Sequence, residues 1–165
     1  MVMRHKTIHD KALLLDSIVD YYVKGRHGIY FPHERLKRVL PMLFPQIKPQ
    51  RKPEGKGSFK TVYRITSRNQ TRDLVLKAGS ATSTKRDWDV YIGLPKGIRN
   101  RYFARIYWPT KYFVLQKFGE KRPVPPDELR RLRAKTRKYL TDVREDNIRF
   151  VDGHFKIVDA HPSKR

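Results

Sequence analysis

The chain has 165 residues, with 38 lysines and arginines against 16 acidic residues, and therefore a formal net charge of +22. A hydrophobic content of 38% and an aromatic content of 12% are enough for a core and exclude a wholly disordered chain. The absence of cysteine excludes a disulfide scaffold, a thiolate zinc site and a cysteine nucleophile, and it fits a reducing cytosol. No stretch approaches the roughly 20 apolar residues of a membrane span, so we expect a soluble, strongly basic protein with no membrane span.

Two amphipathic helices are predicted at the start of the chain. Residues 7–24 place apolar side chains along one wide stripe, and residues 32–44 do the same with a proline in the first turn, where proline is tolerated. A basic linker punctuated by prolines, residues 48–53, marks the only plausible domain boundary. We therefore predict an N-terminal helical extension, residues 1–48, followed by a second domain, residues 49–165.

Beyond the linker the pattern changes from helical to strand-like, with alternating β-favouring residues. The predicted elements are, in chain order, strands over 61–65 and 73–77, a helix over 85–94, strands over 102–108 and 112–118, a helix over 127–140, and strands over 147–151 and 154–159. The last two strands are separated by Asp152-Gly153, a dipeptide that strongly favours a two-residue hairpin turn. This order of elements predicts an α+β domain.

The basic residues are dispersed along the chain and are densest in the predicted helix over 127–140. The six basic side chains of this helix are Arg130, Arg131, Arg133, Lys135, Arg137 and Lys138. Leucines at helical spacing share the segment, so a solvated face backed by an apolar stripe explains this helix better than a binding surface. The charge of the whole chain still favours an anionic partner, either an acidic protein or a nucleic acid.

A glycine-containing loop and a strand lysine are the first candidates for phosphate binding. Gly55 and Gly57 let backbone amides approach a phosphate because no Cβ intervenes, although such a pair is also common in ordinary turns. The loop precedes a strand and not a helix, which argues against a dinucleotide fingerprint. Lys77, 22 residues after Gly55, ends the next strand, where its ammonium can reach phosphates under the loop. A carboxylate should orient it, and the following helix offers Asp87 and Asp89.

The last segment of the chain holds the most specific pattern. Asp142 lies five residues before Asn147, and Asn147 opens the predicted hairpin that ends at Asp159. Because antiparallel strands return the chain to its start, Asn147 and Asp159 should share the open end of the hairpin, where two oxygen ligands suit Mg²⁺ on a nucleotide. Asp142, in the loop that enters the hairpin, could accept a proton from a hydroxyl. Ordinary turn positions explain each residue separately but not their ordered spacing.

In order and spacing these segments resemble the protein-kinase fold, with its Gly-rich loop, strand lysine, helix acid, D-x-x-x-x-N loop and metal-binding Asp. The similarity runs from about Glu54 to His161 and is greatest to the minimal or atypical kinases of bacterial effectors or phages. The resemblance implies an α+β, truncated kinase-like fold. Its parts are an antiparallel N-lobe sheet plus helix and a minimal C-lobe with the catalytic-loop hairpin, preceded here by the N-terminal helical pair.

The resemblance also implies ATP and Mg²⁺ as cofactors and a role for each site residue. Asp142 would be the catalytic base, Lys77 would hold the α/β-phosphates, and Asn147 and Asp159 would bind Mg²⁺. The other residues that it places around the nucleotide are Gly55, Lys56, Gly57, Ser58, Val62, Asp87, Gln116 and Phe118. The segment around Gln116 resembles the hinge that meets adenine through backbone groups.

Several positions depart from the family pattern. The helix acid is Asp87 and not glutamate, Lys60 replaces the third glycine, and Leu140 stands where the family has histidine. Ala160-His161 follows the metal-binding Asp in place of Phe-Gly. The sequence ends at Arg165, six residues after Asp159, so we expect no activation segment, and we expect the N-terminal helices to pack where the missing lobe helices would lie.

The favoured function is that of a minimal serine/threonine protein kinase that phosphorylates a protein hydroxyl or its own chain. An acidic substrate or an activating protein would be its partner, in the cytoplasm or, for a phage or effector protein, in the host-cell cytosol. Two alternatives stay open. One is a catalytically weak pseudokinase that serves as a basic binding module for an acidic protein or nucleic acid. The other is a small-molecule kinase, which needs no activation segment.

Overall fold

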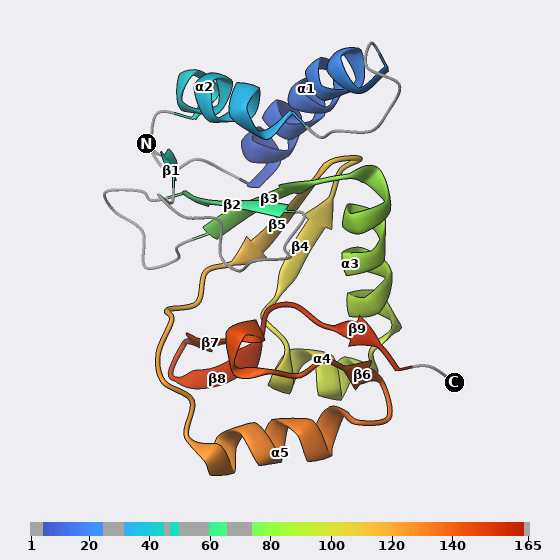
Figure 1. The fold of residues 1–165 in the computed structure, drawn as a ribbon, viewed down its shortest axis with the longest axis vertical. Coiled ribbons are helices and arrows are strands. Elements are labelled where there is room, and N and C mark those ends of the chain that lie inside the picture. Colours follow the sequence, from blue (N-terminus) through green and yellow to red (C-terminus); the bar gives the residue numbers. More distant parts are fainter. Residues whose placement is uncertain (1–4, 25–31, 45–46, 50–59, 66–73, 164–165) are drawn as a thin grey trace.

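The computed structural model describes residues 5–24, 32–44, 47–49, 60–65 and 74–163, and these form an α+β protein (Figure 1). The described helices are α1 (His5–Lys24), α2 (His33–Leu43), α3 (Ala81–Gly93), α4 (Lys96–Tyr102) and α5 (Pro126–Thr136). The described strands are β1 (Ile47–Pro49), β2 (Lys60–Ile65), β3 (Leu74–Gly79), β4 (Ile106–Pro109), β5 (Phe113–Lys117), β6 (Leu140–Thr141), β7 (Ile148–Val151), β8 (His154–Ile157) and β9 (His161–Pro162). Within the described ranges, no helix is long and apolar enough to cross a membrane.

An antiparallel sheet with the strand order β1-β2-β3-β5-β4 lies at the centre of the molecule. Lys77 of β3 is paired with Val62 of β2 on one side and with Val114 of β5 on the other. Because side chains alternate along a strand, this register divides the sheet into two faces. The outer face carries Tyr63, Ile65, Leu74, Leu76, Ala78, Phe113 and Leu115, and the inner face carries Lys60, Val62, Val75, Lys77, Val114 and Gln116.

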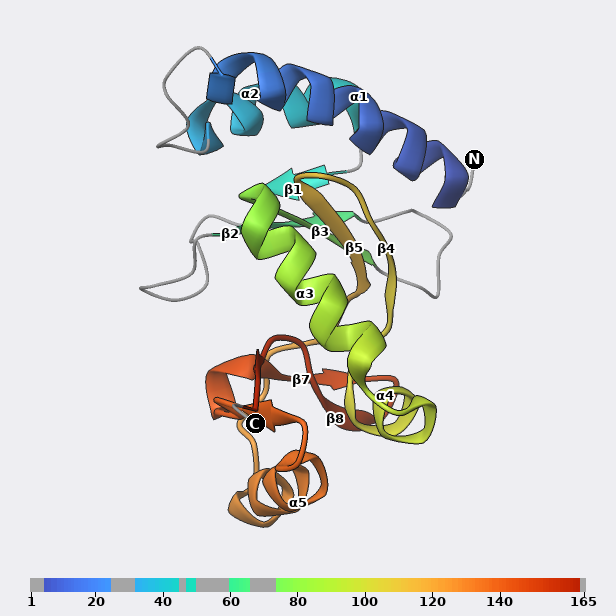
Figure 2. The ribbon, with the colours of Figure 1, turned by 90° about the vertical axis from the view of Figure 1, so that its right-hand side faces the viewer.

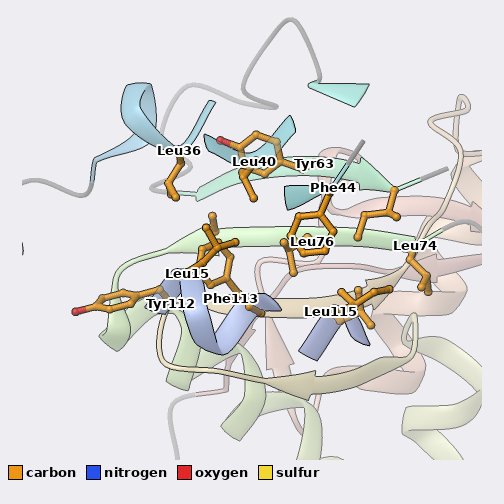
Figure 3. Close-up of a cluster of buried hydrophobic side chains, with 14 of the residues drawn as sticks. Leu15, Leu36, Leu40, Phe44, Tyr63, Leu74, Leu76, Tyr112, Phe113 and Leu115 are labelled. Carbon is orange, nitrogen blue, oxygen red and sulfur yellow. The ribbon is translucent and has the colours of Figure 1, made fainter. Parts of the chain in front are cut away.

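Helices α1 and α2 cover the outer face of the sheet (Figures 1 and 3). In α1 the buried residues Ile8, Ala12, Leu15 and Val19 recur every three or four positions, which places them on one side of the helix. Leu36, Leu40 and Phe44 add the apolar side of α2 to the same core. The two helices therefore do not stand in for missing helices of a C-terminal lobe, and that expectation is wrong. Residues before and after position 48 share this core, and the domain boundary there stays a prediction.

The carboxylate of Asp16 fixes α1 to the turn between β4 and β5. It accepts hydrogen bonds from the Thr110 hydroxyl at 3.0 Å and from the backbone N–H groups of Lys111 and Tyr112 at 3.1 and 3.0 Å. Burial raises the pKa of Asp16 above its ordinary value, and the three hydrogen bonds oppose that rise. One turn further along α1, Asp20 accepts from the side chains of Lys111 and Tyr112.

The C-terminal half lies against the inner face and has a second core. Figure 2 shows α3 running from the sheet to α4, with the β7–β8 hairpin and α5 beyond the sheet. The side chains of this core include Val90, Leu94, Tyr102, Phe103, Val114, Leu132, Ile148 and Ile157. Backbone φ angles of +48° at Asp152 and +83° at Gly153 close the hairpin, and they are the left-handed values that Asp-Gly turns favour. The predicted hairpin is therefore confirmed.

The predicted helices over 7–24 and 32–44 and the strands over 61–65, 73–77 and 112–118 correspond to α1, α2, β2, β3 and β5. Three predicted boundaries are wrong. Helix α3 begins at Ala81 because the Ser80 hydroxyl caps it, accepting from the Ser83 N–H at 3.2 Å. Residues 96–102 form α4, a helix that was not predicted from the sequence. The predicted strand over 102–108 is correspondingly shorter and is β4, Ile106–Pro109. The basic helix ends at Thr136 and Leu140 belongs to β6.

Candidate functional site

The inner face of the sheet gathers three of the residues predicted to surround a nucleotide. Val62 lies opposite Lys77 in the sheet register, and Gln116 lies opposite Val75, the residue two positions before Lys77. All three therefore face the C-terminal half of the molecule. The predicted phosphate loop, with Gly55, Lys56, Gly57 and Ser58, lies outside the described residues, so its role stays a prediction.

The Lys77 ammonium ties β3 to the segment that follows the hairpin. Its Nζ donates to the backbone carbonyl of Val158 at 2.7 Å, across 81 positions of sequence. Burial lowers the pKa of Lys77 below its ordinary value, while the charges of Asp159 and Asp87 oppose that shift. Asp159 follows Val158 directly, so this bond holds the predicted metal ligand close to the sheet.

The helix acid Asp87 pairs with Lys60 and not with Lys77. The Lys60 Nζ lies 2.5 Å from both carboxylate oxygens of Asp87, and both side chains are buried. The same Nζ lies 3.8 Å from Oδ1 of Asp159. Asp89, the other acid considered for this role, pairs with Lys85 on the exposed side of α3. The expectation that Asp87 orients Lys77 is therefore wrong. Asp87 instead belongs to an ion cluster with Lys60 and Asp159.

Sequence reasoning missed Lys60 because it treated this residue only as a substitute for a glycine. The signal that could have found it is strand alternation. Lys60 is two positions before Val62 and shares its face of β2, so the register places it on the inner face with Lys77. Its buried partner on α3 belongs to a different element, and no pattern local to the sequence predicts that contact.

The loop that enters the hairpin brings Asp142 and Asn147 together. Asp142 has a φ of +61°, a left-handed backbone that costs a non-glycine residue about 1 kcal/mol or more. The Asn147 amide nitrogen donates to the backbone carbonyl of Asp142 at 3.0 Å and stabilises this conformation. On the side chain of Asp142, Oδ1 lies 2.7 Å from Nε of Arg144, and Oδ2 lies 3.9 Å from Nε2 of His161.

Asn147 and Asp159 lie at the same open end of the hairpin, as antiparallel geometry requires. The N–H of Val158 donates to the backbone carbonyl of Asn147 at 2.9 Å, one residue beyond the last paired position, Ile148 with Ile157. The Asp159 side chain is 40% exposed, so solvent or a ligand can reach it.

The donor set at this end suits a metal that arrives with its ligand. Among the described residues, no group of three or more His, Asp or Glu side chains is placed to hold a metal ion. Mg²⁺ usually takes one or two protein carboxylates or carbonyls together with substrate phosphates. Asp159 offers one carboxylate and Asn147 one amide oxygen, a donor set compatible with Mg²⁺ that arrives on a phosphate ligand.

The predicted hinge joins the sheet to the C-terminal half. Gln116 is fully buried and donates from Nε2 to the carbonyl of Ala104 at 3.2 Å, and the ring of Phe118 lies 3.8 Å below the Arg64 guanidinium. At Gly119 the chain passes so close to β7 that an added Cβ would lie 2.4 Å from the Cβ of Arg149. Glycine is therefore required at this crossing.

Helix α5 uses part of its positive charge internally. Arg130 and Arg131 pair with Asp127 and Glu128 one turn earlier, as expected for a solvated helix face. Arg133 donates from Nε to the carbonyl of Val143 at 2.8 Å and so supports the loop between Asp142 and Asn147. The remaining basic residues of the segment, Lys135, Arg137 and Lys138, are exposed.

Comparison with known proteins does not assign the chain to a family. No protein-family model matches it, and no curated protein matches its sequence. The resemblance to kinases therefore depends on the motifs and the geometry described above.

Proposed function

We propose that the protein is a minimal kinase-like phosphotransferase that binds Mg-ATP and transfers the γ-phosphoryl group to a serine or threonine hydroxyl. The observation that carries the proposal is the convergence of charged residues from four segments. Lys60 of β2 lies 2.5 Å from Asp87 of α3 and 3.8 Å from Asp159, while Lys77 of β3 bonds to the residue before Asp159. These are the segments in which the motifs were found.

The burial of this cluster supports a role in binding. Lys60, Lys77 and Asp87 are each less than a tenth exposed. Charges are costly to remove from water, and apolar residues of the same size usually stabilise a core as well or better. Buried ionisable clusters therefore concentrate at functional sites, where their charges act on a ligand.

Each residue has a definite task in the proposed reaction. Mg-ATP, when bound, supplies the transferable phosphoryl group and the metal charge that offsets its developing negative charge. Asn147 and Asp159 would hold Mg²⁺, and the buried lysines would balance the charge of the phosphates. Asp142 would accept the proton of the incoming hydroxyl. The net charge of +22 favours an acidic protein as the substrate or partner.

One contact favours a second candidate function, a pseudokinase that works as a basic binding module. The carboxylate proposed as the base is engaged by Arg144 at 2.7 Å. A carboxylate held by an arginine suits a scaffold that binds nucleotide or partner without transfer. Arg144 is itself largely exposed, so a substrate could displace it in the kinase.

The test compares phosphoryl transfer and nucleotide binding in the same variants. Wild type should transfer radiolabel from Mg-ATP to a protein acceptor or to itself, and Mg-ATP should raise its Tm by mass action. Asp142→Ala should lower transfer by about 10²–10⁴-fold and keep the Tm shift on adding Mg-ATP, because general-base help is lost while the proposed metal ligands and buried lysines remain. Its Tm without nucleotide should also fall, because alanine tolerates a φ of +61° less well than aspartate. Asp159→Asn should weaken both transfer and the Tm shift. Asp146→Asn, an exposed acid in the same loop, is the matched control and should change neither.

Two results would contradict the kinase proposal. A wild type with neither a Tm shift at millimolar Mg-ATP nor any transfer would exclude a kinase that acts on its own. A wild type that binds Mg-ATP but transfers phosphate to no acceptor, itself included, would favour the pseudokinase.

A further inference from the structure

The inner face holds two buried lysines, and the structure gives them different partners. Lys60 contacts two carboxylates, Asp87 at 2.5 Å and Asp159 at 3.8 Å, from the two sides of the site. Lys77 donates to a backbone carbonyl, that of Val158. The resemblance to kinases assigns the phosphates and the pairing with the helix acid to Lys77. In the structure it is Lys60 that pairs with the helix acid Asp87.

We infer that Lys60, and not Lys77, is the lysine that the helix acid positions for the phosphates of the nucleotide, and that Lys77 is a positioning residue. This assignment rests on the proposed function and deepens it, because it names the residue that distinguishes a phosphorylated nucleotide from a nucleoside.

The surroundings of Lys60 support the first half of the assignment. Asp87 holds the ammonium from α3, and Asp159 lies on its other side with 40% of its side chain exposed. A ligand that brings Mg²⁺ to Asp159 therefore brings its phosphates next to Lys60. Lys60 also follows the predicted phosphate loop directly in sequence, two positions after Ser58. An ammonium held by two carboxylates is oriented before the ligand arrives, which lowers the entropy lost on binding.

The contact of Lys77 supports the second half. Its bond to Val158 joins β3 to the residue before Asp159, and the N–H of the same residue bonds to the Asn147 carbonyl at 2.9 Å. Lys77 therefore fixes the position of both predicted metal ligands relative to the sheet. Loss of this bond should therefore displace the open end of the hairpin, with both predicted metal ligands. It should not act by removing a direct contact between Lys77 and a phosphate.

The experiment measures the affinity of the full chain for Mg-ATP and for adenosine, which lacks phosphates. Lys60→Met should weaken Mg-ATP binding about ten- to a hundredfold, the effect of one charge-assisted hydrogen bond, and leave adenosine binding unchanged. Lys60→Arg keeps the positive charge and should restore most of the affinity. Lys77→Met should lower the Tm without nucleotide and weaken ATP binding only when Mg²⁺ is present, because it displaces the predicted metal ligands, whereas Lys60→Met should weaken ATP binding with or without Mg²⁺. Lys85→Met, on the exposed side of α3, is the matched control and should change neither ligand.

A second variant and a second readout keep the test decisive. Lys60→Met leaves a buried carboxylate without its main partner, so if it fails to fold, the double variant Lys60→Met/Asp87→Leu, which removes both charges, takes its place. An acyl-phosphate derivative of ATP supplies the second readout, because an amine beside the phosphates takes the acyl group and releases ATP. Peptide mass mapping should find the acyl group on Lys60, and excess ATP should prevent its transfer.

The outcomes separate this assignment from the proposed function. If wild type binds Mg-ATP but Lys60→Met weakens both ligands equally or neither, or if Lys77→Met weakens ATP binding equally with and without Mg²⁺, the assignment is overturned and the proposed function stands. If wild type binds neither ligand, both are overturned.

Discussion

The two faces of the central sheet share the strands β2, β3 and β5 but differ in chemistry. On the outer face Tyr63, Leu76 and Leu115 are buried in one core with apolar side chains of α1 and α2 (Figure 3). On the inner face Lys60 and Lys77 are also buried, with 7% and 8% of their surface exposed. One face of a strand therefore carries hydrophobic side chains, and the other carries charges that contact residues far away in sequence.

This difference separates the part of the sheet that stabilises the fold from the part that is available for binding. Burial of a large apolar side chain contributes about 1.5–3 kcal/mol, so the outer face provides stability directly. A buried ion pair contributes little or nothing compared with an apolar pair of the same size. We conclude that the charges of the inner face are explained better by a ligand than by the fold. Four changes test how the two faces and the contacts around them contribute to stability.

The largest effect should come from deleting residues 1–44, which uncovers the outer face. The deletion removes Leu15, Leu36, Leu40 and Phe44 from the core, and at about 1.5–3 kcal/mol each this loss is comparable with the total stability of a typical domain, about 5–15 kcal/mol. The remaining chain should lose its cooperative unfolding transition in urea and bind a hydrophobic dye.

Point variants on α2 are the control for that deletion. Leu40→Ala should lower the free energy of unfolding by about 2–5 kcal/mol, because Leu40 is fully buried. Met42→Ala, two positions away and 81% exposed, should change it by less than about 0.5 kcal/mol. A fragment of residues 45–165 that unfolds cooperatively would show that α1 and α2 are a separate module.

The next effect concerns the buried ion pair of the inner face. Asp87→Leu should destabilise the protein by about 3–5 kcal/mol, because the buried Lys60 ammonium loses its nearest carboxylate. The double variant Lys60→Met/Asp87→Leu should regain wild-type stability and still bind Mg-ATP about ten- to a hundredfold more weakly than wild type. Urea unfolding and nucleotide titration measure the two properties separately.

The matched control is the exposed pair on the same helix. Asp89→Leu removes the partner of Lys85 at the surface and should change stability by less than about 0.5 kcal/mol. A double inner-face variant as unstable as Asp87→Leu alone would mean that the buried pair serves the fold, which would remove the contrast between the two faces.

A smaller effect is expected at Gly119, where the chain passes from the sheet to the C-terminal half. In Gly119→Ala the new methyl group would lie 2.4 Å from the Cβ of Arg149 and 2.7 Å from Cγ2 of Val151, and such overpacking costs about 1–3 kcal/mol. Gly93→Ala has open space around its Cβ and should be neutral or slightly stabilising. Equal Tm values for the two variants would show that the hairpin moves away from the crossing without cost.

The smallest effect is the pH dependence of the contact between α1 and the β4–β5 turn. Hydrogen bonds from Lys111 and Tyr112 hold the pKa of Asp20 below its ordinary value of 3.8. The contact therefore stabilises the fold above pH 3.8 and is lost as the pH falls through the lowered pKa. Asp20→Asn should lower the Tm at neutral pH, and its Tm should approach that of wild type in acid. A difference that is constant with pH would exclude this titration.

Much of the fold could be predicted because it depends on local chemistry. Strand alternation places Lys60 and Val62 on one face of β2, and the left-handed preference of Asp152-Gly153 closes the hairpin that brings Asn147 and Asp159 together. These features need only the chirality of the backbone and a side-chain period of two. Residues within one element, or on either side of one tight turn, are therefore placed by the sequence itself.

The tertiary structure alone decided the remaining features. The partner of Asp87 depends on how β2 and β3 align and where α3 lies against them, so Lys60 replaced the lysine that spacing favoured. Helix α4 was missed because its last residue, Tyr102, is an aromatic residue of the kind that favours strands. The burial of Tyr102 comes from packing in the second core. The position of α1 and α2 was likewise decided by tertiary packing, because their apolar sides pack against the outer face of the sheet. Contacts between segments far apart in sequence leave no local sequence pattern. Many side chains have the same chemistry, and the packing of the elements decides which of them meet.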